Sequence, residues 1–137
     1  MPSNADRLRE VFHRFWVEHD WDAERGVFAP DIEWRGMDAI GLDGSKLGPR
    51  GVGKFFVDWL EAWEDYSNEA EFHELTPDLV VSKSYFKGRG KGSGIEFETE
   101  LGQVWEFRDG LVVRQTMYRS YEEALAAGRE LAEARSG

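Results

Sequence analysis

Two stretches in the first half of the chain place apolar residues three and four positions apart. The first carries Leu8, Phe12, Phe15 and Trp16, and this spacing predicts an amphipathic helix over residues 4–19. The second carries Val52, Phe55, Phe56, Trp59, Leu60 and Trp63. It predicts a longer helix over residues 49–66, whose apolar stripe needs a broad surface to pack against. Between the two, residues 21–28 favour a short helix and residues 32–35 a short strand.

The second half of the chain changes to a period of two, which is typical of strands with one buried face. Four such runs occupy residues 68–75, 79–87, 95–107 and 111–120. Short turns rich in Gly, Pro and Asp separate them, so successive strands are expected to pair antiparallel. An Ala-rich helix over residues 121–135 follows. Helices first and an antiparallel sheet second predict a single α+β domain over residues 3–135.

The strand over residues 95–107 fixes the expected orientation of the sheet. Its odd positions are mostly apolar and its even positions include Glu96, Glu98, Glu100 and Glu106. The odd positions must face the helices, because burying unpaired carboxylates is very costly. Placing Lys87 opposite Glu96 pairs opposite charges on the outer face. A three-residue loop over residues 108–110 then sets Gln103 opposite Gln115.

This register predicts an apolar inner face that carries a few polar side chains: Ser84, Thr99, Gln103, Gln115 and Arg119. An apolar wall with a few polar groups is how ligand pockets are usually built. A core whose polar residues hydrogen-bond one another is the alternative interpretation. Arg119 favours the pocket, since an inward guanidinium needs an anion or water nearby.

Composition narrows the possible partners. The chain has 17 basic and 27 acidic residues, a net charge of −10, which repels nucleic acid and anionic membrane surfaces. It has no cysteine, so disulfides and thiolate chemistry are excluded. No apolar run approaches the roughly 20 residues that span a bilayer, and no signal peptide is apparent. A soluble, cytoplasmic protein is expected. Nine Phe, six Trp and four Tyr suit a dense core or an apolar pocket.

Several short motifs occur in an order that is characteristic of one superfamily: FAPDIEWR at 28–35, GPRGV at 48–52, GRGKGSG at 88–94, WEFRDGLVVR at 105–114 and YRSYEEAL at 118–125. The chain resembles the nuclear transport factor 2-like superfamily, in particular its SnoaL-like polyketide cyclase and ketosteroid isomerase-like branch. The resemblance implies a cone-shaped, cystatin-like α+β barrel with a curved, mostly antiparallel sheet around N-terminal helices. It also implies a homodimer formed through the outer sheet face, and no cofactor. Because the superfamily includes both enzymes and binding modules, it does not fix an activity.

The catalytic pattern of ketosteroid isomerase does not carry over to this chain. Its tyrosine falls on Phe12, its general base on or near Trp34 or Gly36, and its neutral acid on Gln103. Ketosteroid isomerase chemistry is therefore not expected. The epoxide hydrolase and SnoaL-type cyclase mechanisms need an inward carboxylate, which the register does not supply.

Two other sources of acid–base chemistry are open. Asp38 or Asp43 can reach inward from the loop over the cavity mouth, and His19 can act as a base near neutral pH. No spacing of His and carboxylates indicates a metal site.

Two functions follow as hypotheses. The first is a cofactor-independent isomerase, cyclase, dehydratase or hydrolase that acts on a small hydrophobic oxygenated compound, with His19, Gln103 and Arg119 as catalytic candidates. The second is a non-catalytic ligand-binding or dimeric association module. In both, the same residues are expected to bind the ligand: Phe12, Trp16, Trp34, Phe56, Trp59, Trp63, Ser84, Thr99, Trp105, Gln115 and Met117.

Overall fold

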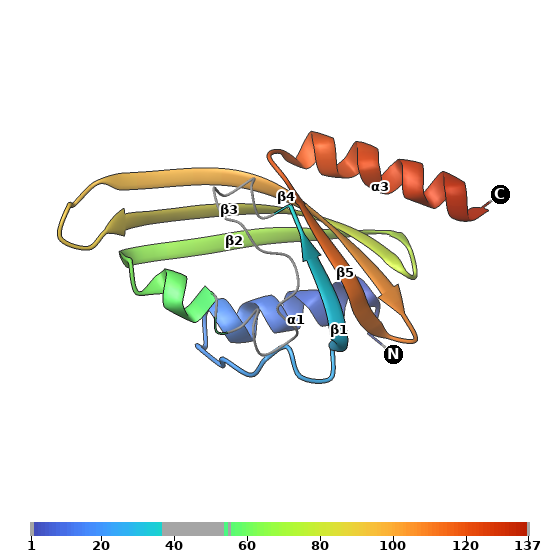
Figure 1. Ribbon diagram of the computed structural model, residues 1–137, viewed down its shortest axis with the longest axis horizontal. Coiled ribbons are helices and arrows are strands. Elements are labelled where there is room, and N and C mark those ends of the chain that lie inside the picture. Colours follow the sequence, from blue (N-terminus) through green and yellow to red (C-terminus); the bar gives the residue numbers. More distant parts are fainter. Residues whose placement is uncertain (1, 37–53, 55, 137) are drawn as a thin grey trace.

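A curved five-stranded sheet separates two helices that lie on its opposite faces (Figure 1). The computed structural model describes residues 2–36, 54 and 56–136. Its elements are α1 (Asn4–Trp16), β1 (Phe28–Arg35), β2 (Trp63–Thr76), β3 (Leu79–Gly90), β4 (Glu96–Arg108), β5 (Leu111–Tyr118) and α3 (Tyr121–Ser136). The strand order is β1-β5-β4-β3-β2; β1 runs parallel to β5 and every other pair is antiparallel. The predicted α+β class with a curved, mostly antiparallel sheet is confirmed.

Helix α1 begins where the sequence supplies a cap. The Ser3 hydroxyl accepts a hydrogen bond from the backbone N–H of Asp6 at 3.1 Å, and Asp6 places a negative charge in the first turn. Leu8 and Phe15 are buried against the sheet, as their spacing predicts. The helix ends at Trp16, three residues before the predicted end, and His19 already has a left-handed backbone with φ of 57°.

The structure corrects two predicted helices. Residues 21–27 form turns rather than a short helix. Residues 56–60 are helical, but the chain enters β2 at Trp63, so the last turn of the helix predicted over 49–66 is wrong. Trp63 pairs with Gly90 of β3, and this ladder outweighs a local preference for helix. Residues 49–53 and 55 lie outside the described residues, as do Asp38 and Asp43.

The pairing register differs from the prediction by two residues at both hairpins of β4. Lys87 lies opposite Glu98 rather than Glu96, and Gln103 lies opposite Met117 rather than Gln115. The β4–β5 turn has two central residues, Asp109 and Gly110, with φ of 53° and 78°, as in the mirror-image turns of tight hairpins. This turn and a bulge after it account for the shift between β4 and β5. Because side chains alternate with period two, an even shift leaves each residue on its predicted face.

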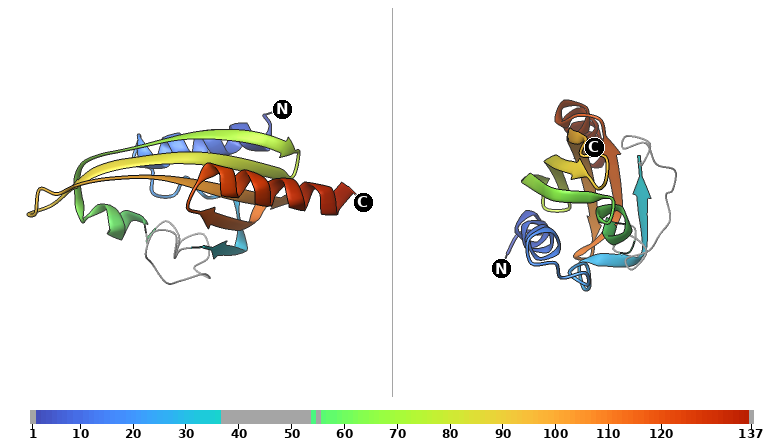
Figure 2. Two further views of the ribbon diagram at one scale, coloured as in Figure 1. Left: turned by 90° about the horizontal axis from the view of Figure 1, so that it is seen from above. Right: turned by 90° about the vertical axis from the view of Figure 1, so that its left-hand side faces the viewer.

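The sheet buries a separate apolar cluster on each face. On the inner face, α1 covers a core built around Leu8, Ile32, Phe72, Trp105 and Val112. On the outer face, α3 packs over Leu79, Val81 and Val104 through Ala124 (Figure 2). Gly102 permits this close approach: a Cβ at that position would lie 2.6 Å from the Cβ of Ala124. Helix α3 therefore occupies part of the outer face.

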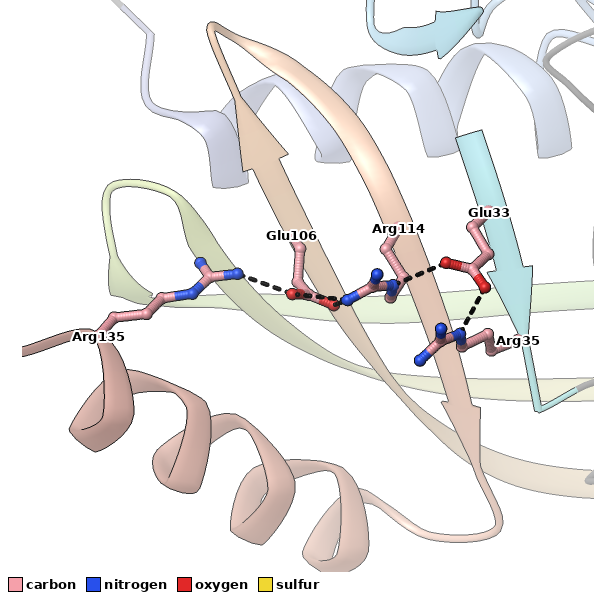
Figure 3. Close-up of polar contacts among 5 residues, drawn as sticks. All are labelled: Glu33, Arg35, Glu106, Arg114 and Arg135. Carbon is pink, nitrogen blue, oxygen red and sulfur yellow. Dashed lines mark hydrogen bonds and ion pairs between the residues drawn. The ribbon is translucent and has the colours of Figure 1, made fainter. Parts of the chain in front are cut away.

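An ion-pair network on the outer face holds the end of α3 (Figure 3). Arg135 donates to Glu106 at 2.7 Å, and Arg114 lies 3.4 Å from the same carboxylate. Arg114 also donates to Glu33 at 2.9 Å, and Arg35 donates to Glu33 at 2.7 Å. Glu106 is 5% exposed, although the alternation placed it with the exposed glutamates of β4. Its burial is possible because two guanidinium groups compensate its charge.

The predicted homodimer through the outer face stays a prediction. Beyond the area that α3 covers, the outer face carries exposed charge pairs such as Lys83–Glu100 at 3.4 Å and Lys87–Glu98 at 3.7 Å.

Candidate functional site

A cavity of about 110 Å³ lies between α1, the turn segment after it and the inner face of the sheet. Its walls are mainly apolar and aromatic side chains: Leu8, Val11, Phe12, Phe15, Trp16, Phe28, Trp34, Phe56, Ala70, Phe72, Trp105 and Met117. Five polar side chains from the strands of the sheet also line the cavity: Asn68, Ser82, Ser84, Gln103 and Gln115. One carboxyl group, that of Glu24, also lines the cavity.

Three hydrogen bonds link part of the polar lining into one network. Ser82 donates to the Gln103 carbonyl oxygen at 2.6 Å, and the Gln103 amide donates to Ser84 at 2.8 Å. The indole N–H of Trp105 donates to Ser82 at 2.8 Å. For these residues the alternative interpretation, polar groups that satisfy one another, is the one the structure shows. Gln103 is thus held at both ends of its amide.

Four other polar atoms of the lining are buried without a hydrogen-bond partner among the described residues: Glu24 Oε2, Trp34 Nε1, Asn68 Oδ1 and Gln115 Oε1. Buried polar groups are nearly always hydrogen-bonded, because leaving one unpaired costs about 1–3 kcal/mol. All four belong to residues that line the same cavity.

Glu24 is positioned by the turns between α1 and β1. Its backbone carbonyl accepts hydrogen bonds from the N–H groups of Val27 and Phe28, both at 3.0 Å, which fixes the segment against the start of β1. The residue is 4% exposed. Burial raises the pKa of its carboxyl above the usual value, Asp22 and Asp20 act in the same direction, and a backbone hydrogen bond and Arg25 oppose them.

Glu24 is the functional candidate that the sequence did not indicate. It stands in the run Asp20-Trp-Asp-Ala-Glu-Arg, where a carboxylate is expected to be solvated, and no period marks it as inward. The alternation along the sheet shows which of its carboxylates face outward, and it gives no information on residues 20–25. The carboxyl comes instead from an irregular segment, which carries no comparable signal.

Most of the predicted ligand-binding residues line the cavity. These are Phe12, Trp16, Trp34, Phe56, Ser84, Trp105, Gln115 and Met117, together with Gln103. Trp59, Trp63 and Thr99 do not line it. Trp59 and Trp63 pack around Phe86 farther along the sheet, with ring centroids 4.6 and 5.5 Å away.

Two of the three catalytic candidates lie outside the cavity. His19 is exposed; its ring stacks on Trp21 with centroids 5.1 Å apart, and its Nε2 lies 3.4 Å from the Tyr66 hydroxyl. Arg119 is exposed because β5 ends at Tyr118, one residue before it, so its predicted inward position is not found. Among the described lining residues, the ionisable group is therefore an acid and not a cation.

The comparisons with known proteins agree with this fold. The SnoaL-like domain family matches residues 8–115, and the chain belongs to this family. A nuclear transport factor 2-like protein from Burkholderia thailandensis is similar in structure, with a TM-score of 0.75 and 21% identity over 94% of this chain and 98% of that one. A similar protein of unknown function from Burkholderia pseudomallei gives a TM-score of 0.70 and 23% identity over 92% and 97%.

A third similar structure is a protein with a ketosteroid isomerase-like fold from Catenulispora acidiphila, in complex with trimethylamine. It gives a TM-score of 0.66 and 17% identity over 90% of this chain and 92% of that one. No curated protein matches the chain significantly in sequence. At these identities, the similar structures establish the fold and leave the activity open.

Two further observations concern the same described part of the chain, residues 2–36, 54 and 56–136. No group of three or more His or carboxylate side chains there lies close enough to hold a metal ion. No helix there is both long and apolar enough to cross a bilayer.

Proposed function

We propose that this protein binds a small, largely apolar molecule in the central cavity. The observation that carries the proposal is the set of four buried, unpartnered polar atoms around an aromatic-lined space. An apolar ligand body would contact the rings, and a few polar groups on it would pair with these atoms. The volume sets the scale: cavities on the order of 150 Å³ accept a benzene-sized molecule, so a ligand of about one ring is favoured.

A second candidate function is a cofactor-independent enzyme that moves a proton on the bound molecule. Glu24 favours it, because burial raises the pKa of its carboxyl, which therefore holds a proton more readily than an exposed carboxyl and can both give up and take back that proton. Gln103, at the position of the ketosteroid isomerase acid, has its amide engaged by Ser82 and Ser84 and is less suited to hold a developing charge. Isomerisation needs no co-reactant, so it is the reaction type that best suits a site with one acid–base group.

Thermal unfolding in the presence of small ring compounds tests the binding function. A ligand that binds the folded state stabilises it by RT ln(1 + [L]/Kd), and it therefore raises Tm. Ala70 lines the cavity, so Ala70→Phe places a ring inside it, whereas Glu69→Phe adds the same ring at the neighbouring exposed position. We expect the ligand-induced rise in Tm to be lost in Ala70→Phe and kept in Glu69→Phe. An equal rise in both variants would place the binding site elsewhere.

The enzyme candidate has its own assay. A ligand found in this way is incubated with the protein in D₂O, and its carbon-bound hydrogens are followed by NMR. Proton transfer through Glu24 predicts deuterium uptake with the wild type and little with Glu24→Gln. Binding without uptake would leave the non-catalytic binding function.

A further inference from the structure

We infer that the ligand of this cavity is a small organic cation, an ammonium group that pairs with Glu24 inside a cage of aromatic rings. The inference rests on the proposed binding function and names the class of ligand. It follows from the charge of the lining, from the nature of its walls and from the type of atom left unpartnered.

The lining carries an acid and, among the described residues, no basic side chain. Glu24 is the ionisable side chain among the described lining residues; no lysine, arginine or histidine of the described chain lines the cavity. The nearby arginines have other partners: Arg14 of α1 donates to Asp20 at 3.1 Å, and Arg25 lies 3.9 Å from Asp22. The residues that α1 and the start of β1 present to the cavity, such as Phe12 and Phe28, are uncharged. A cationic ligand would pair with Glu24 and favour its ionised form, which burial alone disfavours.

The walls favour the same class of ligand. Six of the lining rings belong to Phe12, Phe15, Trp16, Phe28, Trp34 and Trp105. Trp34 and Trp105, which both line the cavity, pack edge to face at 86° with ring centroids 5.7 Å apart. The face of an aromatic ring is electron-rich and attracts a cation within about 6 Å, most strongly for tryptophan and more so in a desolvated site. Ammonium groups are bound in this way by aromatic cages.

The unpartnered atoms are mainly acceptors. Three of the four are oxygens, and they belong to side chains that line the cavity, those of Glu24, Asn68 and Gln115. The fourth, Trp34 Nε1, is a donor and calls for an oxygen on the ligand. A small ammonium compound that also bears a hydroxyl or ether oxygen matches this set. A neutral apolar ligand would leave the Glu24 charge unpaired or force the carboxyl to take up a proton.

Choline and its neutral analogue 3,3-dimethyl-1-butanol test the inference, because they share shape and hydroxyl group and differ in the charge of one atom. Binding is measured by calorimetry and by the fluorescence of the cavity tryptophans. We expect the wild type to bind choline at least about tenfold more tightly than the alcohol. Choline does not titrate, so its affinity should rise with pH as Glu24 ionises, and then level off.

Two variants test whether Glu24 causes the preference for choline over the neutral alcohol. Glu24→Gln keeps the shape of the side chain and removes the charge, so the preference for choline should disappear. Glu18→Gln makes the same change at an exposed position between α1 and β1 and should keep it. Should Glu24→Gln fail to fold, the comparison of the two compounds on the wild type decides by itself.

The possible outcomes distinguish failure of the cationic-ligand inference from failure of the proposed binding function. Equal affinity for the two compounds, or tighter binding of the alcohol or of other neutral ring compounds, would overturn the cationic ligand and leave the binding function standing. Choline bound equally by the wild type and by Ala70→Phe would also overturn it, because the site would lie outside the cavity. If neither these compounds nor any of the ring compounds binds, the proposed function itself fails.

Discussion

Replacing Glu24 by glutamine is expected to make the empty protein more stable at neutral pH. The Glu24 carboxyl is 4% exposed, its Oε2 has no partner among the described residues, and burial raises its pKa. The folded state therefore holds the proton at pH values where the unfolded chain, with a pKa near 4.5, has released it. Between the unfolded and the folded pKa the native state binds more protons, so the free energy of unfolding falls as pH rises. Glutamine does not titrate, so the variant should not lose this stability as the pH rises.

The size of the effect follows from the extra cost of a buried carboxyl that ionises, compared with a neutral amide of the same shape. Unpaired charged groups cost more than unpaired neutral ones, and a carboxyl that can keep its proton limits the difference to about 1–2 kcal/mol. For a domain of this length each kcal/mol moves Tm by about 3–5 °C. We therefore expect Glu24→Gln to melt about 3–10 °C above the wild type at pH 7. Below the pKa of the unfolded carboxyl the two proteins should melt together.

The assay is urea and thermal unfolding of both proteins from pH 4 to pH 8, without added ligand. Glu18→Gln is the matched control, because it makes the same substitution at an exposed position between α1 and β1. Its difference from the wild type should stay within about 0.5 kcal/mol and vary little with pH. Parallel curves for wild type and Glu24→Gln, or a less stable variant at pH 7, would refute the reasoning, since Glu24 would then have a compensating partner.

Three other substitutions test the frame around the cavity. Glu106→Ala leaves Arg114 and Arg135 without their shared carboxylate and should cost about 1–3 kcal/mol in urea unfolding; an unchanged midpoint would show that the network does not hold α3. Ser82→Ala leaves a buried indole N–H and an amide oxygen unpaired and should lower the unfolding free energy by about 1–3 kcal/mol, with a change in tryptophan fluorescence; no change in either would contradict the network. Gly102→Ala sets a Cβ 2.4 Å from a backbone carbonyl oxygen, so it should lower Tm by several degrees, and a wild-type Tm would contradict the packing of α3.

The regular half of this molecule was predictable because its periods are clear. Alternation along β4 placed Gln103 and Trp105 on the inner face and Glu98 on the outer one, and the structure agrees. The exact register of the strand pairs was not predictable, because the length of the turn and a bulge determine it. Charge pairs do not determine it, because opposite charges can pair diagonally across two strands as well as directly. The register error of two residues left every side chain on its predicted face of the sheet and changed only which residues lie opposite each other. The wrong prediction for Arg119 has a separate cause, since β5 ends at Tyr118 and Arg119 lies beyond it.

The sequence predicted the aromatic walls of the cavity but not its acidic group. The aromatic walls follow from helical and strand spacing, so Phe12, Trp34 and Trp105 were identified in advance. Glu24 was not, because its burial results from the path of an irregular segment between α1 and β1. The burial of Glu106 was missed for a related reason: it depends on Arg135, which is distant in sequence and approaches only after α3 folds over the sheet.

An electron-density map of the cavity, from crystals of protein isolated from its own host, tests directly whether the cavity holds a small molecule. We expect density larger than water in the space that Phe12, Trp34 and Trp105 line, with an atom of the bound molecule within hydrogen-bonding distance of the Glu24 carboxyl group. A cavity filled by side chains, or a Glu24 carboxylate paired with a group of the protein, would contradict it.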